Sequence, residues 1–269
     1  MGRHLIAFGA SVNPSSLTKM APVADGTLTI AQNTVLLPAG LTNLVGVYGG
    51  CPGGTSPGFT RYQVVTPSLK NNSVPIEIDQ VDTTSTNPND TIVDRNGAIQ
   101  MFDDAPVPLV AGEGLEVDVL TAGGTAGQVT VLCWLDDLNN IPVTGRPICG
   151  VRATSSTTLT ANTWTSCSIT FDNTLPAGTY AIIGMHAESA TGYAARIIIS
   201  GTWRMGVVPC LDTKGTRPGQ FRMGRMGNPA PGTYYSWGAF VNTTPPNIEF
   251  LAYAADTSET VLFDLIKIA

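Results

Sequence analysis

The feature of this sequence that most restricts its fold is an internal repeat. Residues 36–50, LLPAGLTNLVGVYGG, return later as residues 174–188, TLPAGTYAIIGMHAE. The Pro-Ala-Gly steps begin at Pro38 and Pro176, 138 positions apart. The apolar residues after each step also return at this spacing: Leu44, Val45 and Val47 in the first copy, and Ile182, Ile183 and Met185 in the second. We therefore interpret the chain as two copies of one β unit.

The repeat extends beyond this stretch. Residues 59–65 match residues 194–200, with Arg61 against Arg196. Two further pairs are again 138 positions apart: Phe102 with Phe240, and Pro108 with Pro246. Residues 248–253 and 260–268 are predicted to form a terminal hairpin that mirrors an earlier one in the first half.

Composition indicates the fold class. Only 13% of the residues are charged and 43% are hydrophobic, which excludes a disordered chain. The 29 Gly and 19 Pro residues, together with abundant Thr, Val and Ile, predict many short strands joined by turns. No apolar run reaches the length of a membrane span. The sequence therefore predicts an all-β fold of two tandem jelly-roll sandwich units, each with about eight short strands.

Four segments follow from the pattern of turns and alternation. Residues 1–25 lack periodicity and are expected to form an N-terminal arm. Residues 26–136 are expected to form the first jelly roll, and residues 137–156, rich in Gly, Pro and Asn, a connector. Residues 157–269 are expected to form the second jelly roll.

The clearest predicted hairpin lies in residues 106–136. Its first strand alternates apolar Leu115, Val117 and Val119 with acidic residues, a Gly-rich turn follows, and Val129 to Leu135 alternate back. One face is apolar and the other polar, as in one sheet of a sandwich.

Net charge and targeting signals restrict the partners. The formal net charge is −6, which disfavours a protein that binds nucleic acid through its charge, so we expect no sequence-specific nucleic-acid binding. The N-terminal apolar run is too short for a secretory signal, so we expect a protein made in the cytoplasm without processing.

Residue types for catalysis or metal binding do not form a recognisable pattern. The five Cys residues show no CxxC pair and are expected to be buried free thiols: Cys51, Cys133, Cys149, Cys167 and Cys210. His4 and His186 are the only histidines, and His186 is expected on a strand that faces solvent or an interface. We predict no catalytic, cofactor-binding or metal-binding residues and no cofactor. Glu113 and Glu116 are expected to be solvent-facing charges on a turn and a strand.

Three loops invite a ligand interpretation. Residues 49–58, GGCPGGTSPG, lack the Gly-Lys-Ser/Thr ending of a phosphate loop and predict an inter-strand loop. Residues 82–97 are polar and contain Asp82, Asp90 and Asp94, but without the spacing of a calcium loop. Residues 212–232 hold four basic residues: Lys214, Arg217, Arg222 and Arg225. These predict either an interface with an anionic partner or a solvated loop, and the sequence leaves both open.

The duplicated LPAG unit, the PLVAGEGLEV stretch and the WTSCSITFDNTLPAGTYAIIG stretch resemble a viral family. Over most of residues 26–269 the chain is similar to the double jelly-roll major capsid proteins of tailless, often membrane-containing, double-stranded DNA viruses and phages. The resemblance implies a homotrimer of pseudo-hexagonal outline that tiles an icosahedral virion shell. It also implies contacts with neighbouring capsomers, with minor capsid or vertex proteins, and with an internal lipid membrane.

An alternative function remains open at this point. A carbohydrate-binding β-sandwich module or a receptor-binding spike would have a similar composition. Its sugar-stacking residues would be among the four tryptophans: Trp134, Trp164, Trp203 and Trp237. Large aromatic residues more often pack in cores and interfaces.

The predicted apolar face gives a test. Val117→Asp or Val131→Asp is expected to prevent folding, because each places a charge among apolar side chains. Circular dichroism and solubility of the purified variants measure this. A soluble, normally assembled variant would show that the face assignment is wrong.

Overall fold

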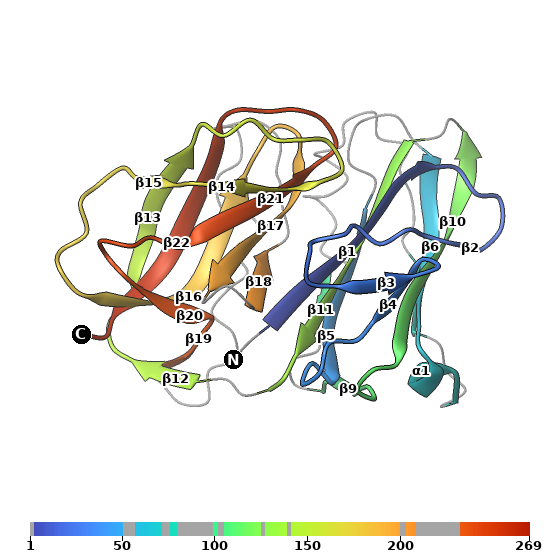
Figure 1. Cartoon of the computed structure of the whole chain (residues 1–269), viewed down its shortest axis with the longest axis horizontal. Coiled ribbons are helices and arrows are strands. Elements are labelled where there is room, and N and C mark those ends of the chain that lie inside the picture. The colour runs from blue at the N-terminus through green and yellow to red at the C-terminus, as the bar shows by residue number, and fades with distance from the viewer. Residues whose placement is uncertain are drawn as a thin grey trace. The chain divides into compact units, whose positions relative to one another are not determined.

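The computed structural model describes residues 3–50, 57–71, 76–79, 99–101, 105–124, 127–138, 141–199, 203–207 and 232–269. Strands dominate these ranges, and their single helix is the five-residue α1 (Pro67–Asn71) (Figure 1). The chain divides into two compact units. One comprises Leu5–Asp136, and the other comprises Asp137–Ala269 together with the first four residues.

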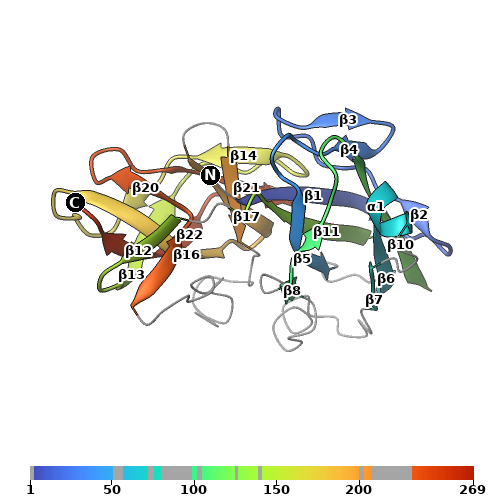
Figure 2. The same ribbon diagram turned by 90° about the horizontal axis from the view of Figure 1, so that it is seen from below.

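The first unit consists of two sheets. Its strands are β1 (Arg3–Val12), β2 (Thr18–Lys19), β3 (Thr29–Ala31), β4 (Thr34–Leu36), β5 (Asn43–Gly50), β6 (Pro57–Val65), β7 (Ile76–Asp79), β8 (Ile99–Met101), β9 (Val107–Pro108), β10 (Gly114–Gly124) and β11 (Gly127–Asp136). The sheet orders are β1-β11-β5-β8 and β3-β4-β10-β6-β7, and the short strands β9 and β2 pair with β5 and β10. Figure 2 shows these strands from a direction perpendicular to Figure 1.

The strand order identifies this unit as a jelly roll. Its eight main strands, in chain order, are β1, β4, β5, β6, β7, β8, β10 and β11. Numbered one to eight, they form sheets of order 1-8-3-6 and 2-7-4-5. Two interlocked Greek keys produce this order, in which successive main strands cross between the sheets everywhere except from β6 to β7.

The second unit repeats the same order. Its strands are β12 (Ile141–Thr144), β13 (Ile148–Ser155), β14 (Trp164–Cys167), β15 (Thr170–Phe171), β16 (Thr179–Glu188), β17 (Gly192–Ile199), β18 (Trp203–Val207), β19 (Thr233–Ser236), β20 (Gly238–Val241), β21 (Asn247–Ala252) and β22 (Glu259–Lys267). The sheets β13-β22-β16-β20 and β14-β21-β17-β18 again read 1-8-3-6 and 2-7-4-5, with β15 added at one edge. Strands β12 and β19 pair separately. The predicted fold of two tandem jelly rolls is therefore confirmed.

Apolar side chains from both sheets fill the second jelly roll. Tyr180 and Ile182 come from one sheet, and Ile197, Ile248 and Phe250 come from the other. All five are fully buried. Burial of this kind is the main stabilising term of a sandwich fold.

The predicted hairpin of residues 106–136 is wrong, and its alternation of an apolar and a polar face holds only for β10. β10 pairs with β6 and β4, whereas β11 pairs with β5 in the opposite sheet. Val117 is fully buried between half-buried acidic neighbours, as predicted. On β11, every side chain from Val129 to Asp136 is buried, so both faces of the strand are covered. The predicted terminal hairpin fails likewise, because β21 and β22 lie in different sheets.

The expected N-terminal arm contains the first main strand. β1 joins the first sheet beside β11, and the side chains from Arg3 to Phe8 are buried. A strand buried on both faces shows no alternation of apolar and polar residues. The sequence of β1 therefore lacks the period of two that identifies a strand exposed on one face.

The expected connector contains the first main strand of the second jelly roll. β13 pairs with β22 on one side and β15 on the other. Gly145 lies in the bend before this strand, with φ of 144°, and Gly150 lies within β13 at a register shift, with φ of 75°.

The third main strand of the first jelly roll carries a β-bulge. Leu44 of β5 pairs with Leu135 of β11. The next pair along the strands joins Gly46 to Trp134, which leaves Val45 as an extra residue. A bulge of this kind bends the strand and increases its twist.

The second jelly roll has the same bulge at the equivalent place. Ile182 of β16 pairs with Leu265 of β22, and the next pair joins Gly184 to Asp264. The extra residue is Ile183, 138 positions after Val45. The backbone geometry therefore repeats at the same offset as the sequence.

The offset changes on the fourth main strand. Each jelly roll has a second bulge there. In the first, it lies between the pairs Arg61–Leu120 and Phe59–Thr121. In the second, it lies between the pairs Ala194–Leu251 and Gly192–Ala252. Alignment of these bulges makes Arg196 equivalent to Gln63, 133 positions earlier. The predicted equivalence of Arg61 and Arg196 is therefore wrong by two residues.

Pro108 and Pro246 are not equivalent either. Pro108 lies in β9 and pairs with Asn43 of β5. The residue of β16 equivalent to Asn43 is Ala181, and its partner in β20 is Ala239. Pro246 instead directly precedes β21, outside any strand. Pro108 therefore matches Ala239, an offset of 131 positions.

The turn between β3 and β4 offers a stability test. Ala31 pairs with Thr34, and the two turn residues Gln32 and Asn33 have φ of 50° and 63°. Two positive φ values define a type I′ turn, for which Gly is preferred at the second position. Asn33→Gly is expected to raise the free energy of unfolding by about 0.5 kcal/mol in urea denaturation.

A strand position provides the matched control for this test. Thr29→Gly is expected to lower the free energy of unfolding. Position 29 lies in a strand, where Gly loses more conformational entropy on folding and has no side chain to pack. Equal destabilisation by both glycines would contradict the type I′ turn.

Candidate functional site

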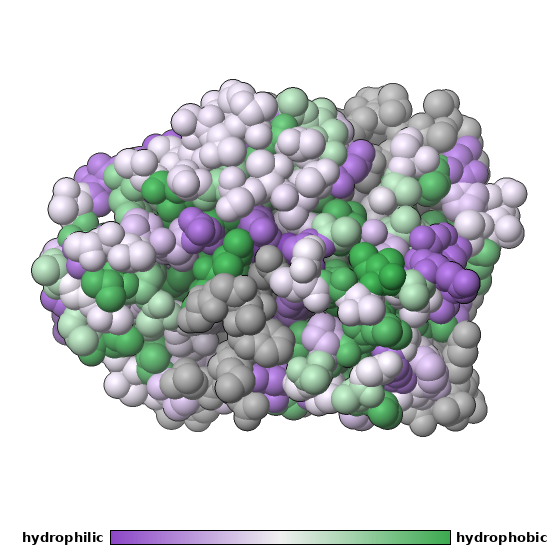
Figure 3. Space-filling view, viewed as in Figure 1, coloured by the Kyte–Doolittle hydropathy of each residue, from purple (hydrophilic) through white to green (hydrophobic). Residues whose placement is uncertain are grey.

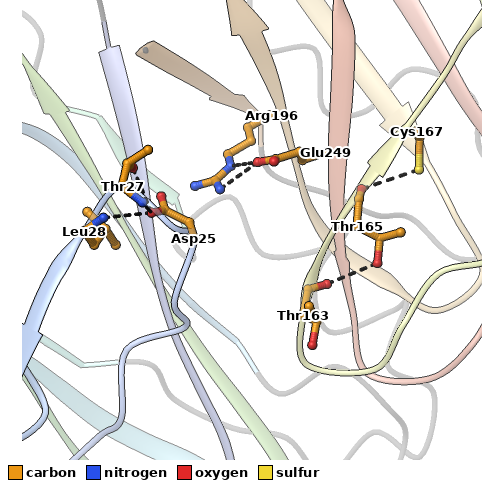
Figure 4. Close-up of polar contacts among 8 residues, drawn as sticks. All are labelled: Asp25, Thr27, Leu28, Thr163, Thr165, Cys167, Arg196 and Glu249. Carbon is orange, nitrogen blue, oxygen red and sulfur yellow. Dashed lines mark hydrogen bonds and ion pairs between the residues drawn. The ribbon is translucent and has the colours of Figure 1, made fainter. Parts of the chain in front are cut away.

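A buried charged cluster lies in the second jelly roll. Arg196 of β17 is fully buried, donates a hydrogen bond through Nε to Glu249 Oε2 of β21 at 2.7 Å, and forms an ion pair with the same oxygen through Nη2 at 2.7 Å (Figure 4). Its guanidinium carbon lies 3.7 Å from the ring centroid of Trp164 on β14. Because β14, β21 and β17 are neighbours in one sheet, three adjacent strands supply one residue each.

This cluster combines an ion pair with a cation–π contact. The hydrogen bond, the ion pair with the same carboxylate and the aromatic face together compensate the desolvation of the guanidinium. At the equivalent positions of the first jelly roll, Gln63 pairs with Asp118, and both side chains are half-buried. The charged cluster therefore has no counterpart at these equivalent positions of the first jelly roll, and its chemistry is structural.

Two cysteines are buried thiols, as predicted. Cys133 and Cys167 are both free and fully buried. Burial raises the pKa of Cys167 to about 11, with a smaller contribution from Glu259. Burial also raises the pKa of Cys133 above its usual range. Both groups stay protonated at neutral pH and are poor nucleophiles.

The histidine prediction needs a correction. His186 is buried on β16 and does not face solvent, and its Nε2 lies 3.2 Å from Glu188 Oε1. A strand residue and its neighbour two positions later share one face of a sheet.

The two glutamates predicted to face solvent form hydrogen bonds and an ion pair within the first jelly roll. Glu113 accepts hydrogen bonds from the Val110 and Ser68 amides at 2.7 and 2.9 Å. Glu116 forms an ion pair with Lys19 at 2.8 Å. Both carboxylates therefore hold loops and strands together.

The part of the chain that the structure describes contains no cluster of side chains that could form a metal site. No three His, Cys, Asp or Glu side chains there lie close enough to hold a metal ion. In the same ranges, no helix is long and apolar enough to cross a membrane.

Three of the four tryptophans are buried. Trp134 is fully buried, and Trp164 and Trp237 are 8% and 3% exposed. Trp164 covers Arg196, and Trp237 belongs to the core of the second jelly roll. None of these three rings is available to stack on a sugar.

A groove of about 560 Å³ opens in the second jelly roll. Ile182, Phe240 and Val241 line it from one sheet, and Ile198 and Ile199 from the other. None of the described residues that line it is charged. The two sheets approach closely here, since a Cβ on Gly238 would lie 2.1 Å from Ile199 Cδ1. Hydrophobic atoms also reach the surface elsewhere, as Figure 3 shows for one face.

Sequence reasoning missed both the ion pair and the groove. An Arg and a Glu on separate strands, 53 residues apart, give no local signal of their contact. The groove depends on the approach of two sheets, which alternation does not reveal. A Gly within a strand, such as Gly238, is the one sequence signal of such a close approach.

Several predicted features lie outside the described residues. They are the polar loop of residues 82–97 with its three Asp residues, the four basic residues Lys214, Arg217, Arg222 and Arg225, and Cys51, Cys210 and Phe102. The Trp203 and Cys149 side chains are also outside the description. The choice between an interface and a solvated loop for residues 212–232 stays a prediction.

Comparison with known proteins adds one likeness. No protein-family model and no curated protein matches this chain. Among solved structures, it is similar to the major capsid protein P2 from bacteriophage PM2, at 12% identity and a TM-score of 0.21, over 99% of this chain and 98% of the other. A TM-score this low carries no argument, so the fold assignment rests on the strand order.

The buried ion pair gives a quantitative prediction. Arg196→Met is expected to lower the free energy of unfolding by about 3 kcal/mol or more, because it leaves the Glu249 carboxylate buried without its cation. The double variant R196M/E249L is expected to be closer to the natural protein, since neither partner remains charged. Denaturant titration measures both.

An exposed ion pair in the same unit is the matched control. Arg152 pairs with Asp172, with side chains 49% and 33% exposed. Arg152→Met is expected to change the free energy of unfolding by less than about 1 kcal/mol. Similar losses for R152M and R196M would contradict the role given to burial.

Proposed function

We propose that this chain is the major capsid protein of a tailless icosahedral double-stranded DNA virus or phage. The observation that carries the proposal is the tandem pair of jelly rolls with the same strand order and the same bulge on the third strand. The chain acts as a structural virion protein without catalysis and is located in the capsid after synthesis in the host cytoplasm.

The mechanism is geometric. Two similar rolls per chain give six similar units in a trimer, so a threefold complex has a pseudo-hexagonal outline. A capsomer of that outline packs among six neighbours, and closed symmetric assembly then builds a shell. The register shared by the two rolls is what makes their surfaces similar enough for this arrangement.

The partners follow from that arrangement. The chain binds other copies of itself in the trimer and in neighbouring capsomers. Minor capsid or vertex proteins and an internal lipid membrane complete its surroundings, without sequence-specific nucleic-acid binding. The net charge of −6 is compatible with a shell that does not contact the genome directly.

The carbohydrate-binding alternative receives no support from the described residues. Stacking on a sugar needs an exposed aromatic face. Trp134, Trp164 and Trp237 are buried, so the sequence feature that suggested this function serves the protein core instead.

Light scattering after size-exclusion chromatography tests the proposal. The expected mass is about 84 kDa, three times the 28.1 kDa of one chain. Electron micrographs of the same sample should show particles of hexagonal outline. A monomer at all protein concentrations, or a monomer that binds to a glycan array, would overturn the proposal.

A further inference from the structure

A turn after the sixth main strand recurs in both jelly rolls. In the first, the Leu109 amide donates to the Thr42 carbonyl at 2.8 Å. The Glu113 amide then donates to the Val110 carbonyl at 3.1 Å and closes the turn. Sequence comparison at the 138-residue offset does not detect this turn, because the offset here is 131 residues.

The second jelly roll contains the equivalent turn. Phe240 of β20 pairs with Tyr180, the residue of β16 that is equivalent to Thr42. The Thr244 amide donates to the Val241 carbonyl at 2.7 Å. Val241 therefore occupies the position of Val110.

The two turns share a pattern of burial. Leu109 and Phe240 are 6% and 7% exposed, whereas Val110 and Val241 are 63% and 47% exposed. These valines are the two most exposed large hydrophobic residues in the part of the chain that the structure describes. A single exposed Val needs no explanation. The same exposed Val on equivalent turns, whose other residues differ, points to a shared contact.

Both turns are held in place by a polar side chain. Glu113 accepts the Val110 and Ser68 amides in the first jelly roll. In the second, Asn242 Oδ1 accepts a hydrogen bond from the Gly178 backbone amide at 3.0 Å, and the Asn242 backbone amide donates one to the Gly178 carbonyl at 3.0 Å. Turns fixed in this way lose little conformational entropy when they bind a partner.

The second turn borders the uncharged groove. Val241 and Phe240 line it, together with Thr244 and Pro246. Its volume of about 560 Å³ has room for an aliphatic side chain such as that of Val110. The absence of Lys and Arg from the described lining disfavours lipid head groups or nucleic acid, which bind basic surfaces.

We propose that the Val110 turn of one copy packs into the groove beside Val241 of a second copy. The contact joins equivalent turns of a first and a second jelly roll from different chains. It uses two different patches, so it is a heterologous contact, the kind that a closed trimer requires, rather than a self-complementary one. The inference rests on the proposed self-assembly and specifies which surfaces meet.

Charge insertion and charge pairing test the contact. V110E alone and V241K alone are expected to shift the concentration for half-assembly at least tenfold upward, measured by light scattering after size-exclusion chromatography. The double variant V110E/V241K is expected to recover assembly at low salt, because the new carboxylate and ammonium meet between copies. L17E places the same charge at another exposed apolar residue, and it should assemble like the natural protein.

The remaining outcomes separate the inference from the proposed function. A natural protein that stays monomeric overturns the proposed function itself. If the natural protein assembles and both single variants assemble equally well, only the contact is wrong. Failure of the double variant to recover, with melting temperatures unchanged, also overturns it. If the single variants assemble normally but no longer float with phosphatidylcholine vesicles, the valines contact lipid instead of a second copy.

Discussion

The structure depends on the return of the last strand of each unit to the centre of a sheet. β11 lies between β1 and β5, and β22 lies between β13 and β16. These ladders join residues far apart in sequence, so they form only when the rest of the jelly roll is in place. Because the last strand pairs on both edges and is covered on both faces, its register fixes the register of its neighbours.

The bulges at Val45 and Ile183 belong to these same ladders. Each inserts one residue opposite the last strand and bends the sheet at the same position in both rolls. A bend of this kind is costly to move, because a one-residue shift would turn every following side chain to the other face. The two rolls therefore keep the same shape, although few of their side chains are identical.

The buried polar groups of the second jelly roll have a structural role. The Arg196–Glu249 pair is buried, and burial keeps the Cys167 thiol protonated by raising its pKa. At the equivalent turns of the two rolls, the exposed side chains of Val110 and Val241 are both aliphatic. Equivalent turns that both expose an apolar side chain are suited to the contact between copies proposed above.

The sequence by itself determined the all-β class, the duplication, and the apolar face of β10, because turn residues and alternation are local signals. It did not determine which sheet each strand joins. Alternation places Val117 and Val131 on buried faces but does not distinguish a hairpin from strands in opposite sheets. β1 was missed because a doubly buried strand has no alternation. Only the tertiary structure decided these points. Loops of unequal length change the repeat offset from 138 to 133 and 131 residues. Equivalent residues such as Val110 and Val241 can therefore be identified only from the backbone pairing.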